Sequence, residues 1–287
     1  CRSSSWWTGT SPSISAMPDL MAIPFVDHHS HPWLRRWRDL DAAGFRQCFS
    51  ESPSSAFAAE HVPRSLPYLR ALRMLGEVLQ CDPDEAAILR ERRAGPPDAY
   101  LRRLFSGTNV STVLIDDGYP PESESLDLGE MSGLLAVQTR RVLRLEALVE
   151  RLTPSAASFA DVLARFDAVV GNVRGTAVAL KSIAAYRSGL RLAPVDARAA
   201  EASWSTWQAT IKATGSSRLV AKDVVDFFVL RALDHAARQG LAVQFHTGYG
   251  DPDLDLREAN PLHLRPVIED GRFGGAKLVL LHAAYPY

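Results

Sequence analysis

The chain has 287 residues with a formal net charge of -1, and 46% of the residues are hydrophobic and 23% charged. This is the composition of an ordinary globular protein with enough apolar residues for a full core. Near-neutral charge without a basic run gives no support for nucleic-acid binding, and no stretch of about 18 consecutive apolar residues predicts a membrane span.

The three cysteines, Cys1, Cys48 and Cys81, are odd in number and share no spacing typical of a metal site. A disulfide framework is therefore not expected, and the pattern fits a reducing, cytoplasmic compartment.

Residues 1–20 are rich in serine at their start and lack the apolar run of a secretory signal. We expect them to be a disordered leader, with Met17 or Met21 as the candidate true start. The folded part is then expected at residues 21–287.

The first predicted strand, Ile23–Pro32, opens with apolar residues and ends in a His-x-His pair, His29 and His31. Alternate side chains of a strand share a face, so Asp27 points to the same side as the two histidines, and His28 points outward. Two imidazoles at this spacing can bind one metal ion, although on this stretch alone a polar strand end with solvated histidines is an equally good interpretation.

Residues from about 33 to 107 are rich in Arg, Leu, Ala and Glu with helical periodicity. We expect a helical insertion after the first strand that covers one mouth of the fold.

From residue 110 onward, apolar runs alternate with amphipathic stretches. Further strands are predicted at 110–116, 142–146, 176–182, 241–247 and 277–282, and helices at about 130–140, 159–170, 222–239 and 261–270, with another capped by Asp196. Strands that alternate with helices predict a parallel sheet with right-handed crossovers.

In the helix at 222–239 we expect Arg231, Asp234, His235 and Arg238 on a solvated face, with Asp234 and Arg238 forming an ion pair. His235 is therefore excluded from the candidate site.

Six such units fit either an open doubly wound sheet or most of a barrel. No glycine-rich phosphate-binding motif follows the first strand, and ligand-type residues recur at the carboxyl ends of the strands, as in barrel enzymes. We therefore predict an α/β fold, a (β/α)8 TIM barrel that stops after about six strands. We also expect exposed edges on strands one and six, and an isolated fragment that folds poorly.

The alternation of faces brings candidate ligands to one mouth of this barrel. The inward residues are expected to be Ala177, Ala179 and Lys181 on the fourth strand, Gln244 and His246 on the fifth, and Leu278, Leu280 and His282 on the sixth. One histidine at a strand end is usually structural, but several that converge are harder to explain without a ligand. Zinc suits imidazole and carboxylate ligands, and it activates water at neutral pH.

The pattern resembles the amidohydrolase superfamily, in particular its amidohydrolase-related branch of metal-dependent hydrolases and decarboxylases, which also includes the non-synthetase half of glutamine-synthetase fusion proteins. The resemblance covers about residue 23 to the end and rests on Val26–Pro32, Leu114–Tyr119, Leu180–Leu190, Gln244–Asp253 and Leu281–His282.

This resemblance implies that His29, His31 and His246 bind metal, and that His282 either binds a second metal or orients the substrate or water. Lys181 is either a carbamylated bridge between two metals or a cationic anchor for a substrate carboxylate. His282 and Lys181 are thus the candidate catalytic residues. The family's strand-eight aspartate lies beyond the end of the sequence, so catalysis by this fragment is in doubt.

Other polar residues are candidates for substrate contact. Arg187 follows the fourth strand and could pair with a carboxylate, although a surface arginine is the commoner case. Tyr249 and Asp251 lie on the loop after the fifth strand. Asp116 and Glu146, at the predicted ends of strands two and three, are candidate hydrogen-bond partners of the histidines.

The sequence therefore predicts a hydrolase that holds one or two divalent ions, most simply zinc, and acts on an amide, lactone or similar carbonyl of a small-molecule substrate. A nonoxidative decarboxylase on the same scaffold and a non-catalytic regulatory barrel are the alternatives. Homo-oligomerisation is left open.

Overall fold

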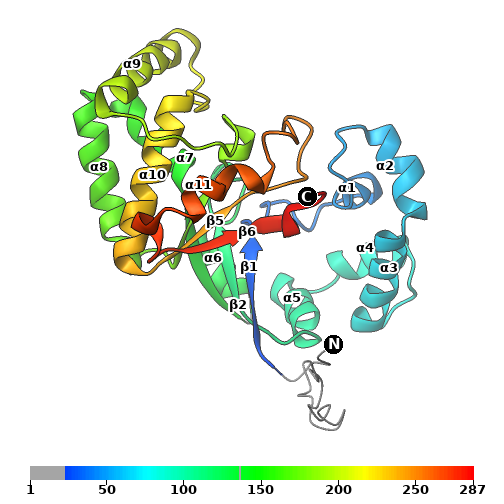
Figure 1. Cartoon of the computed structure of the whole chain (residues 1–287). Coiled ribbons are helices and arrows are strands. Elements are labelled where there is room, and N and C mark those ends of the chain that lie inside the picture. The colour runs from blue at the N-terminus through cyan, green and yellow to red at the C-terminus, as the bar shows by residue number, and fades with distance from the viewer. Residues whose placement is uncertain (1–22, 136) are drawn as a thin grey trace, which may run out of the picture.

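The computed structural model describes residues 23–135 and 137–287, so the predicted leader at 1–20 lies outside the described residues. The described residues form a six-stranded parallel sheet in which each strand pairs with the next along the chain. The sheet curls into a half-barrel (Figure 1), which confirms the α/β class and the parallel topology. Its strands are β1 (Phe25–Ser30), β2 (Val110–Asp116), β3 (Gln138–Arg144), β4 (Ala179–Ser182), β5 (Ala242–Phe245) and β6 (Lys277–Leu280).

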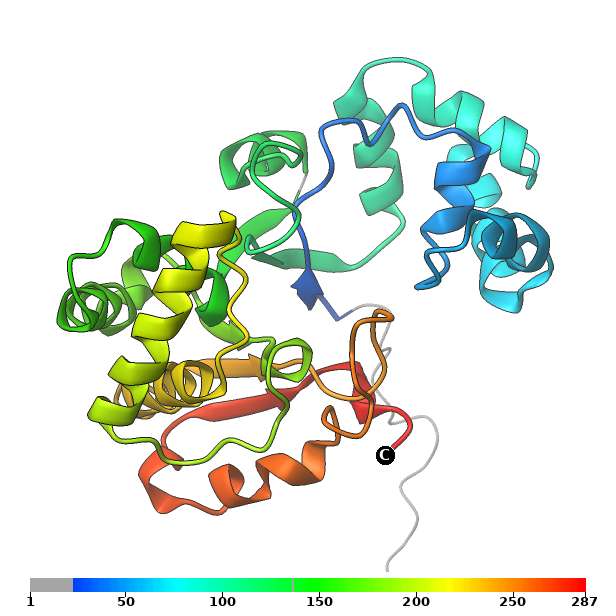
Figure 2. The ribbon, with the colours of Figure 1, turned by 90° about the horizontal axis from the view of Figure 1, so that it is seen from above.

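Helices that follow β2 to β5 cover the outer face of this sheet (Figure 2). They are α6 (Leu128–Leu134), α7 (Leu145–Leu152), α8 (Phe159–Gly171), α9 (Ala197–Thr214), α10 (Lys222–Gln239) and α11 (Arg265–Ile268). The main apolar core lies between helices and strands, where Phe166 and Phe228 pack with Leu180, Val243 and Phe245. Leu180 faces these helices while its neighbour Lys181 faces the interior, as strand alternation requires.

Helix boundaries follow the capping chemistry of the sequence. Asp196 caps α9 by accepting a hydrogen bond from the backbone N–H of Ala199 at 2.8 Å. Gly240 ends α10 in the left-handed region, with φ of 62°, where a residue without a Cβ is favoured.

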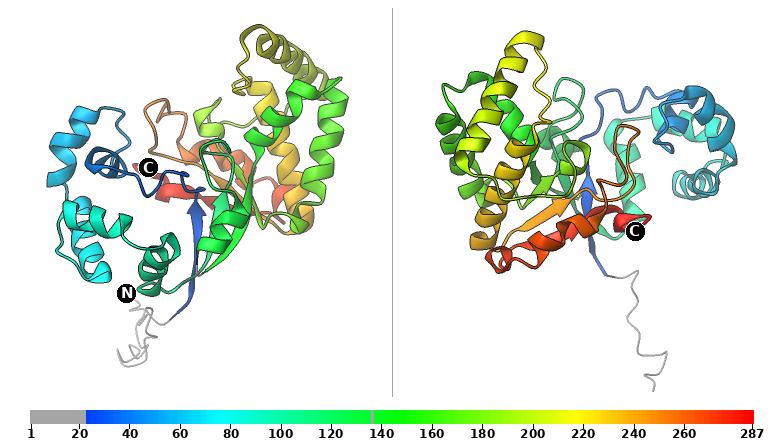
Figure 3. Two further views of the ribbon diagram at one scale, coloured as in Figure 1. Left: turned by 180° about the vertical axis from the view of Figure 1, so that it is seen from behind. Right: turned by 45° about the horizontal axis from the view of Figure 1, so that its top comes forward.

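Between β1 and β2, the chain forms a separate helical group. Its helices are α1 (Ala42–Gln47), α2 (Ser55–His61), α3 (Leu66–Leu79), α4 (Glu85–Arg93) and α5 (Pro97–Ser106). They enclose their own apolar cluster, which includes Trp37, Phe45, Tyr68 and Leu79. The group lies on the other side of β1 from α7–α10 (Figure 3).

Short 3-10 helices complete the described elements: η3 (Val62–Arg64), η4 (Thr153–Ser155), η5 (Val173–Gly175), η6 (Ala184–Tyr186), η7 (Pro261–Leu264), η8 (Gly271–Phe273) and η9 (Leu281–Ala284). Within residues 23–135 and 137–287, no helix has both the length and the apolar content needed to cross a bilayer.

The third strand begins four residues and ends two residues earlier than predicted. β3 ends at Arg144, and the helix expected to reach residue 140 already ends at Leu134. The strand was hard to predict because its first half is charged. In the structure, Arg141 is stabilised in the sheet by an ion pair with Asp117 at 2.6 Å, a tertiary contact that the sequence pattern does not show. Glu146 therefore lies in the first turn of α7 and not at a strand end.

On β6 the predicted inward face was wrong. Leu278 pairs in register with Val243 and packs against the outer core, so Leu278 faces the helices. His282 still reaches the interior because the backbone turns after β6. His282, Ala283 and Ala284 all have left-handed φ values, of 64°, 50° and 53°.

The predicted solvated face of α10 was also wrong in part. His235 is half-buried, and its Nε2 lies 3.0 Å from Asp167 Oδ1 on α8, where Arg231 pairs with the same carboxylate. An ion pair between Asp234 and Arg238 does not occur in the described part of the chain. His235 therefore joins two helices.

A hydrogen bond crosses the interior of the half-barrel. The side-chain Nε2 of Gln244 on β5 donates to the backbone oxygen of His28 on β1 at 2.7 Å. These strands are not neighbours in the sheet. The bond therefore fixes the distance between the first strand and the fifth.

Candidate metal centre and substrate pocket

The carboxyl ends of the strands surround a cavity of about 700 Å³. All eight candidate residues predicted from the sequence line it: His29, His31, Lys181, Arg187, His246, Tyr249, Asp251 and His282. They come from β1, β4 and the segments that follow β1, β4, β5 and β6. The parallel topology explains this meeting, since the carboxyl ends of all strands lie at one edge.

Four imidazole rings form a continuous row along this cavity. The ring centroids are 5.6 Å apart for His31 and His29, 4.9 Å for His29 and His282, and 4.5 Å for His282 and His246. Three separate segments of the chain supply them, so the row is a product of the tertiary fold.

These histidines are held in the neutral form. The pKa of His29 is lowered to about 3, mainly by burial and to a smaller extent by the charge of Lys181 and the nearby imidazoles. Burial and the proximity of His282 lower the pKa of His246 to about 3 as well. The pKa values of His31 and His282 are also lowered, chiefly by burial. A neutral imidazole is the form that binds a metal ion.

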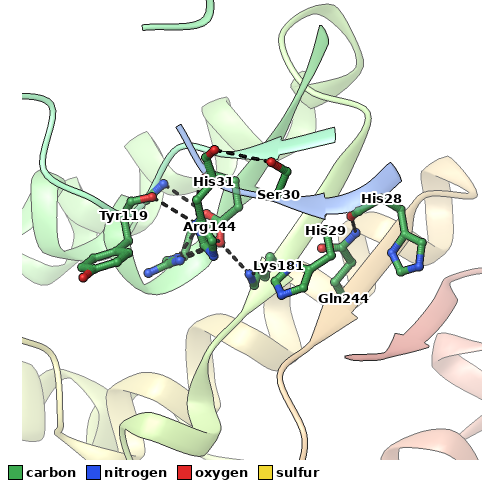
Figure 4. A network of polar contacts seen from close by, with 10 residues as sticks. His28, His29, Ser30, His31, Tyr119, Arg144, Lys181 and Gln244 are labelled. Atoms are coloured by element: carbon green, nitrogen blue, oxygen red, sulfur yellow. Dashed lines mark hydrogen bonds and ion pairs between the residues drawn. The ribbon is translucent and has the colours of Figure 1, made fainter. Parts of the chain in front are cut away.

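The tautomer of His31 follows from its contacts. Its Nδ1 lies 3.2 Å from the backbone oxygen of Asp116 and 3.1 Å from that of Tyr119 (Figure 4). Carbonyl oxygens only accept hydrogen bonds, so Nδ1 carries the proton and Nε2 keeps its lone pair free for a cation.

His246 has a buried nitrogen without a partner. Its Nε2 is out of reach of solvent and makes no hydrogen bond with any described residue. Tyr186 covers the ring, with centroids 4.4 Å apart, and burial raises the pKa of the Tyr186 hydroxyl to about 12. Such an orphaned polar atom in a native interior calls for a bound group.

The donor set suits a zinc-type ion, because imidazole nitrogen is a preferred zinc ligand. The ligands are not arranged as a closed set, however. In residues 23–135 and 137–287, no three His, Cys, Asp or Glu side chains converge closely enough to enclose an ion. The side chains are thus of the types that bind a metal ion, and some of them must rotate before they can enclose one.

Lys181 belongs to a buried charged network. Its Nζ lies 2.8 Å from Asp116 Oδ2 and 3.4 Å from His29 Nδ1. Asp116 also accepts from Arg144, whose Nη2 lies 2.6 Å from Oδ2. Burial would raise the pKa of Asp116, but Arg144 and Lys181 hold it down at about 2. Burial lowers the pKa of Lys181, against the opposing effect of Asp116.

Several cavity residues were missed by sequence reasoning, among them Arg144 and Tyr186. Arg144 ends β3, and the misplaced third strand hid it. Tyr186 lies in η6, where only its position just after the fourth strand could have indicated it.

The predicted histidine partners divide into two cases. Asp116 Oδ2 lies 3.8 Å from His31 Nδ1, as expected of a partner. Glu146 instead accepts a hydrogen bond from Ser182 Oγ at 2.7 Å beneath the cavity. Burial raises the pKa of Glu146, against the opposing effect of its hydrogen bond with Ser182.

Arg187 is buried and not on the surface. Its side chain is 9% exposed, and its Nη2 lies 3.1 Å from Glu150 Oε1. The other two nitrogens, Nε and Nη1, have no partner among the described residues.

The rim of the cavity is formed by the loop after β5 and by the helical group. Tyr249 is 54% exposed, and the backbone N–H of Asp251 donates to Tyr186 Oη at 3.2 Å. Glu51, between α1 and α2, lines the same rim. A hydrogen bond with Asp251, together with burial, raises the pKa of Glu51.

Comparison with known proteins gives similarities to a curated protein and to a solved structure. No protein-family model matches the chain. It is 27% identical over 296 residues to Protein fluG of Emericella nidulans, covering 92% of this chain and 33% of that protein, so the chain spans about a third of this curated relative. It also resembles a crystal structure from Lactobacillus casei with a TM-score of 0.80 and 28% identity, covering 93% of this chain and 69% of that one. That protein carries a provisional assignment as a metal-dependent hydrolase.

Proposed function

We propose that this protein is a metal-dependent hydrolase that acts on an amide, lactone or similar carbonyl of a small molecule. The likeness to the Lactobacillus casei protein, over nearly the whole chain, supports the general class. The similarity to Protein fluG covers a third of that protein and adds no substrate.

The observation that carries the proposal is the row of four neutral imidazoles, which ends at the buried His246. His246 Nε2 has no partner among the described residues. A structural role would be expected to give this nitrogen a hydrogen bond. A divalent cation would satisfy it, and imidazole donors favour zinc.

We assign the metal ligands to His29, His31 and His246, with His282 beside them as a ligand of a second ion or as the residue that orients substrate. When bound, a divalent cation supplies Lewis acidity to a carbonyl oxygen and lowers the pKa of water. The protonated Nδ1 of His31 fixes the orientation of its ring through the two backbone oxygens.

Lys181 has two candidate roles, as a carbamylated bridge between two ions or as a cationic anchor. Its ion pair with Asp116 at 2.8 Å supports the anchor role, because a carbamylated lysine would present a negative charge to that carboxylate. Tyr186 stays protonated at neutral pH and is placed to donate a hydrogen bond near His246.

The test is metal content by elemental analysis of the purified chain after dialysis against zinc, combined with a panel of amides and lactones. We expect bound zinc in the native protein and in His61→Ala, a control on exposed helix α2. His29→Ala and His246→Ala should lose it. Two ions per chain that fall to one or none in Lys181→Ala would favour the bridge, and one ion unaffected by that change would favour the anchor.

The rival functions give different results in the same experiment. Release of carbon dioxide from an acid substrate, without hydrolysis of any amide or lactone, would identify a decarboxylase. A native chain that binds no metal would refute the hydrolase.

A further inference from the structure

The floor of the cavity is more basic than its internal ion pairs require. Arg144, Lys181 and Arg187 all line it. Asp116 is shared between Lys181 and Arg144, while Glu150 contacts a single nitrogen of Arg187. Glu146 is a third buried carboxylate whose charge acts on Arg187, but it accepts from Ser182 and makes no hydrogen bond with Arg187 among the described residues, so donors of the basic side chains remain unpaired.

The excess is concentrated at Arg187. Its side chain is nine-tenths buried, yet Nε and Nη1 make no hydrogen bond with the part of the chain that the structure describes. Leaving buried donors of a charged group unpaired is costly, so a native protein normally supplies a partner. Glu150 contacts Arg187 only through Nη2, and its Oε1 also accepts from the backbone N–H of Leu219 at 2.7 Å.

Arg144 provides a second fixed guanidinium in the same wall. Its Nε and Nη2 are held by Asp116 at 2.6–3.1 Å, which leaves Nη1 without a hydrogen bond to the described residues. Gly118 makes room for it, since a Cβ there would lie 2.5 Å from Arg144 Cδ. The side chain therefore cannot turn away from the cavity without breaking its pair with Asp116.

We infer that the substrate of this site carries an oxyanion group, a carboxylate or a phosphate, that binds to Arg187 with Arg144 as a second contact. Planar guanidinium groups match both anions with parallel hydrogen bonds. The imidazole row then remains available to contact the reacting group of the substrate. This inference rests on the proposed function for the identity of the site and adds the class of substrate.

The position of Arg218 provides an internal comparison. Arg218 lines the same cavity, but it is half exposed and pairs with Asp253 at 2.8 Å at the rim. Charge alone would make Arg218 an equally good anchor. Burial and unpaired donors distinguish Arg187 from it.

The experiment measures anion binding by isothermal titration calorimetry on the full, metal-free chain at constant ionic strength. The probes are malonate, inorganic phosphate and malonamide, the uncharged counterpart of malonate. We expect malonate or phosphate to bind and malonamide not to bind. Arg187→Gln should weaken the anion about tenfold or more, and Arg218→Gln should leave the affinity unchanged. Which of the two anions binds tighter distinguishes a carboxylate substrate from a phosphorylated one.

Absence of binding by both anions would overturn the inference, as would equal affinity in the native protein and Arg187→Gln, which is the result expected if a buried water satisfies Arg187. If circular dichroism shows that Arg187→Gln is unfolded, then Arg187→Lys and Arg144→Gln decide, and both should weaken binding. Anion binding by a protein that takes up no zinc would support the inference and refute the hydrolase. Zinc binding without anion binding would do the reverse.

Discussion

Lys181 Nζ and Asp116 Oδ2 are 2.8 Å apart, and each side chain is 2% exposed. Asp116 is also the only carboxylate that contacts Arg144 among the described residues. One buried carboxylate thus balances two buried cations directly beneath the imidazole row. Removing one member of such a network leaves an uncompensated charge, which is far more costly than losing an exposed pair.

Asp116→Asn should therefore destabilise the fold by about 3–5 kcal/mol. Lys181→Met should cost less, since Asp116 keeps Arg144 as its partner. Urea unfolding measures both. The control is Asp98→Asn, which removes the exposed ion pair with Arg102 and should leave the unfolding free energy nearly unchanged. Similar losses of unfolding free energy in Asp116→Asn and Asp98→Asn would show that Asp116 does not balance the charges of Lys181 and Arg144.

Stability should fall as the pH is lowered below neutral. An unfolded histidine takes up a proton near pH 6.5, whereas folded His29 and His246 do so only near pH 3. Between these values the unfolded chain binds more protons, so acidification favours unfolding. The urea midpoint should drop steadily from pH 7 to pH 4, and His246→Gln should reduce the slope. A midpoint that does not change over this range would show that the imidazoles are not held neutral.

The close packing at Gly250 should be essential to the site. A Cβ at this position would lie 2.9 Å from His246 Nε2 and would clash with Tyr186 Oη. Gly250→Ala should therefore displace the loop or the imidazole and lower zinc affinity about tenfold, measured by competition with a chelating dye. Gly271→Ala is the matched control, because nothing lies within 4 Å of its Cβ. Unchanged zinc affinity in Gly250→Ala would indicate that His246 is not a metal ligand.

The contact between Glu51 and Asp251 should depend on pH. The raised pKa of Glu51 means that the hydrogen bond between the two carboxyl groups needs a proton, so the contact should weaken as the pH rises above the ordinary range for glutamate. Because intrinsic amide exchange is base-catalysed, the measurement compares protection factors, which should be lower for residues 249–256 at pH 7 than at pH 4.5. In Glu51→Gln the amide donates at both pH values, so this difference in protection should disappear. Equal protection factors in the native protein at the two pH values would contradict this coupling.

Much of the fold followed from the sequence because local signals agreed. The alternation of strands and helices predicted the parallel sheet, and Asp196 and Gly240 marked helix ends by ordinary capping chemistry. β3 was misplaced because Arg140 and Arg141 do not look like strand residues. Their place in the sheet depends on tertiary contacts such as the pair between Arg141 and Asp117.

The candidate ligands line one cavity, but not always for the reason that the sequence suggested. His282 was assigned by strand alternation, whereas it enters the interior through a left-handed turn after β6. Arg144 could not be found while the third strand was misplaced. The burial of Arg187 and the cover of Tyr186 over His246 arise only when distant segments pack together.

The hydrogen bond between Gln244 and His28 joins β5 to β1, so the curvature of the sheet influences the geometry of the cavity. β1 and β6 are the two edges of the sheet, yet their histidines His29 and His282 are neighbours in the cavity. A small change in the curvature of the sheet therefore produces a larger change in the distance between its two edge strands. Substitutions in the distant outer core that flatten or tighten this curvature should alter the spacing of these rings without touching either one.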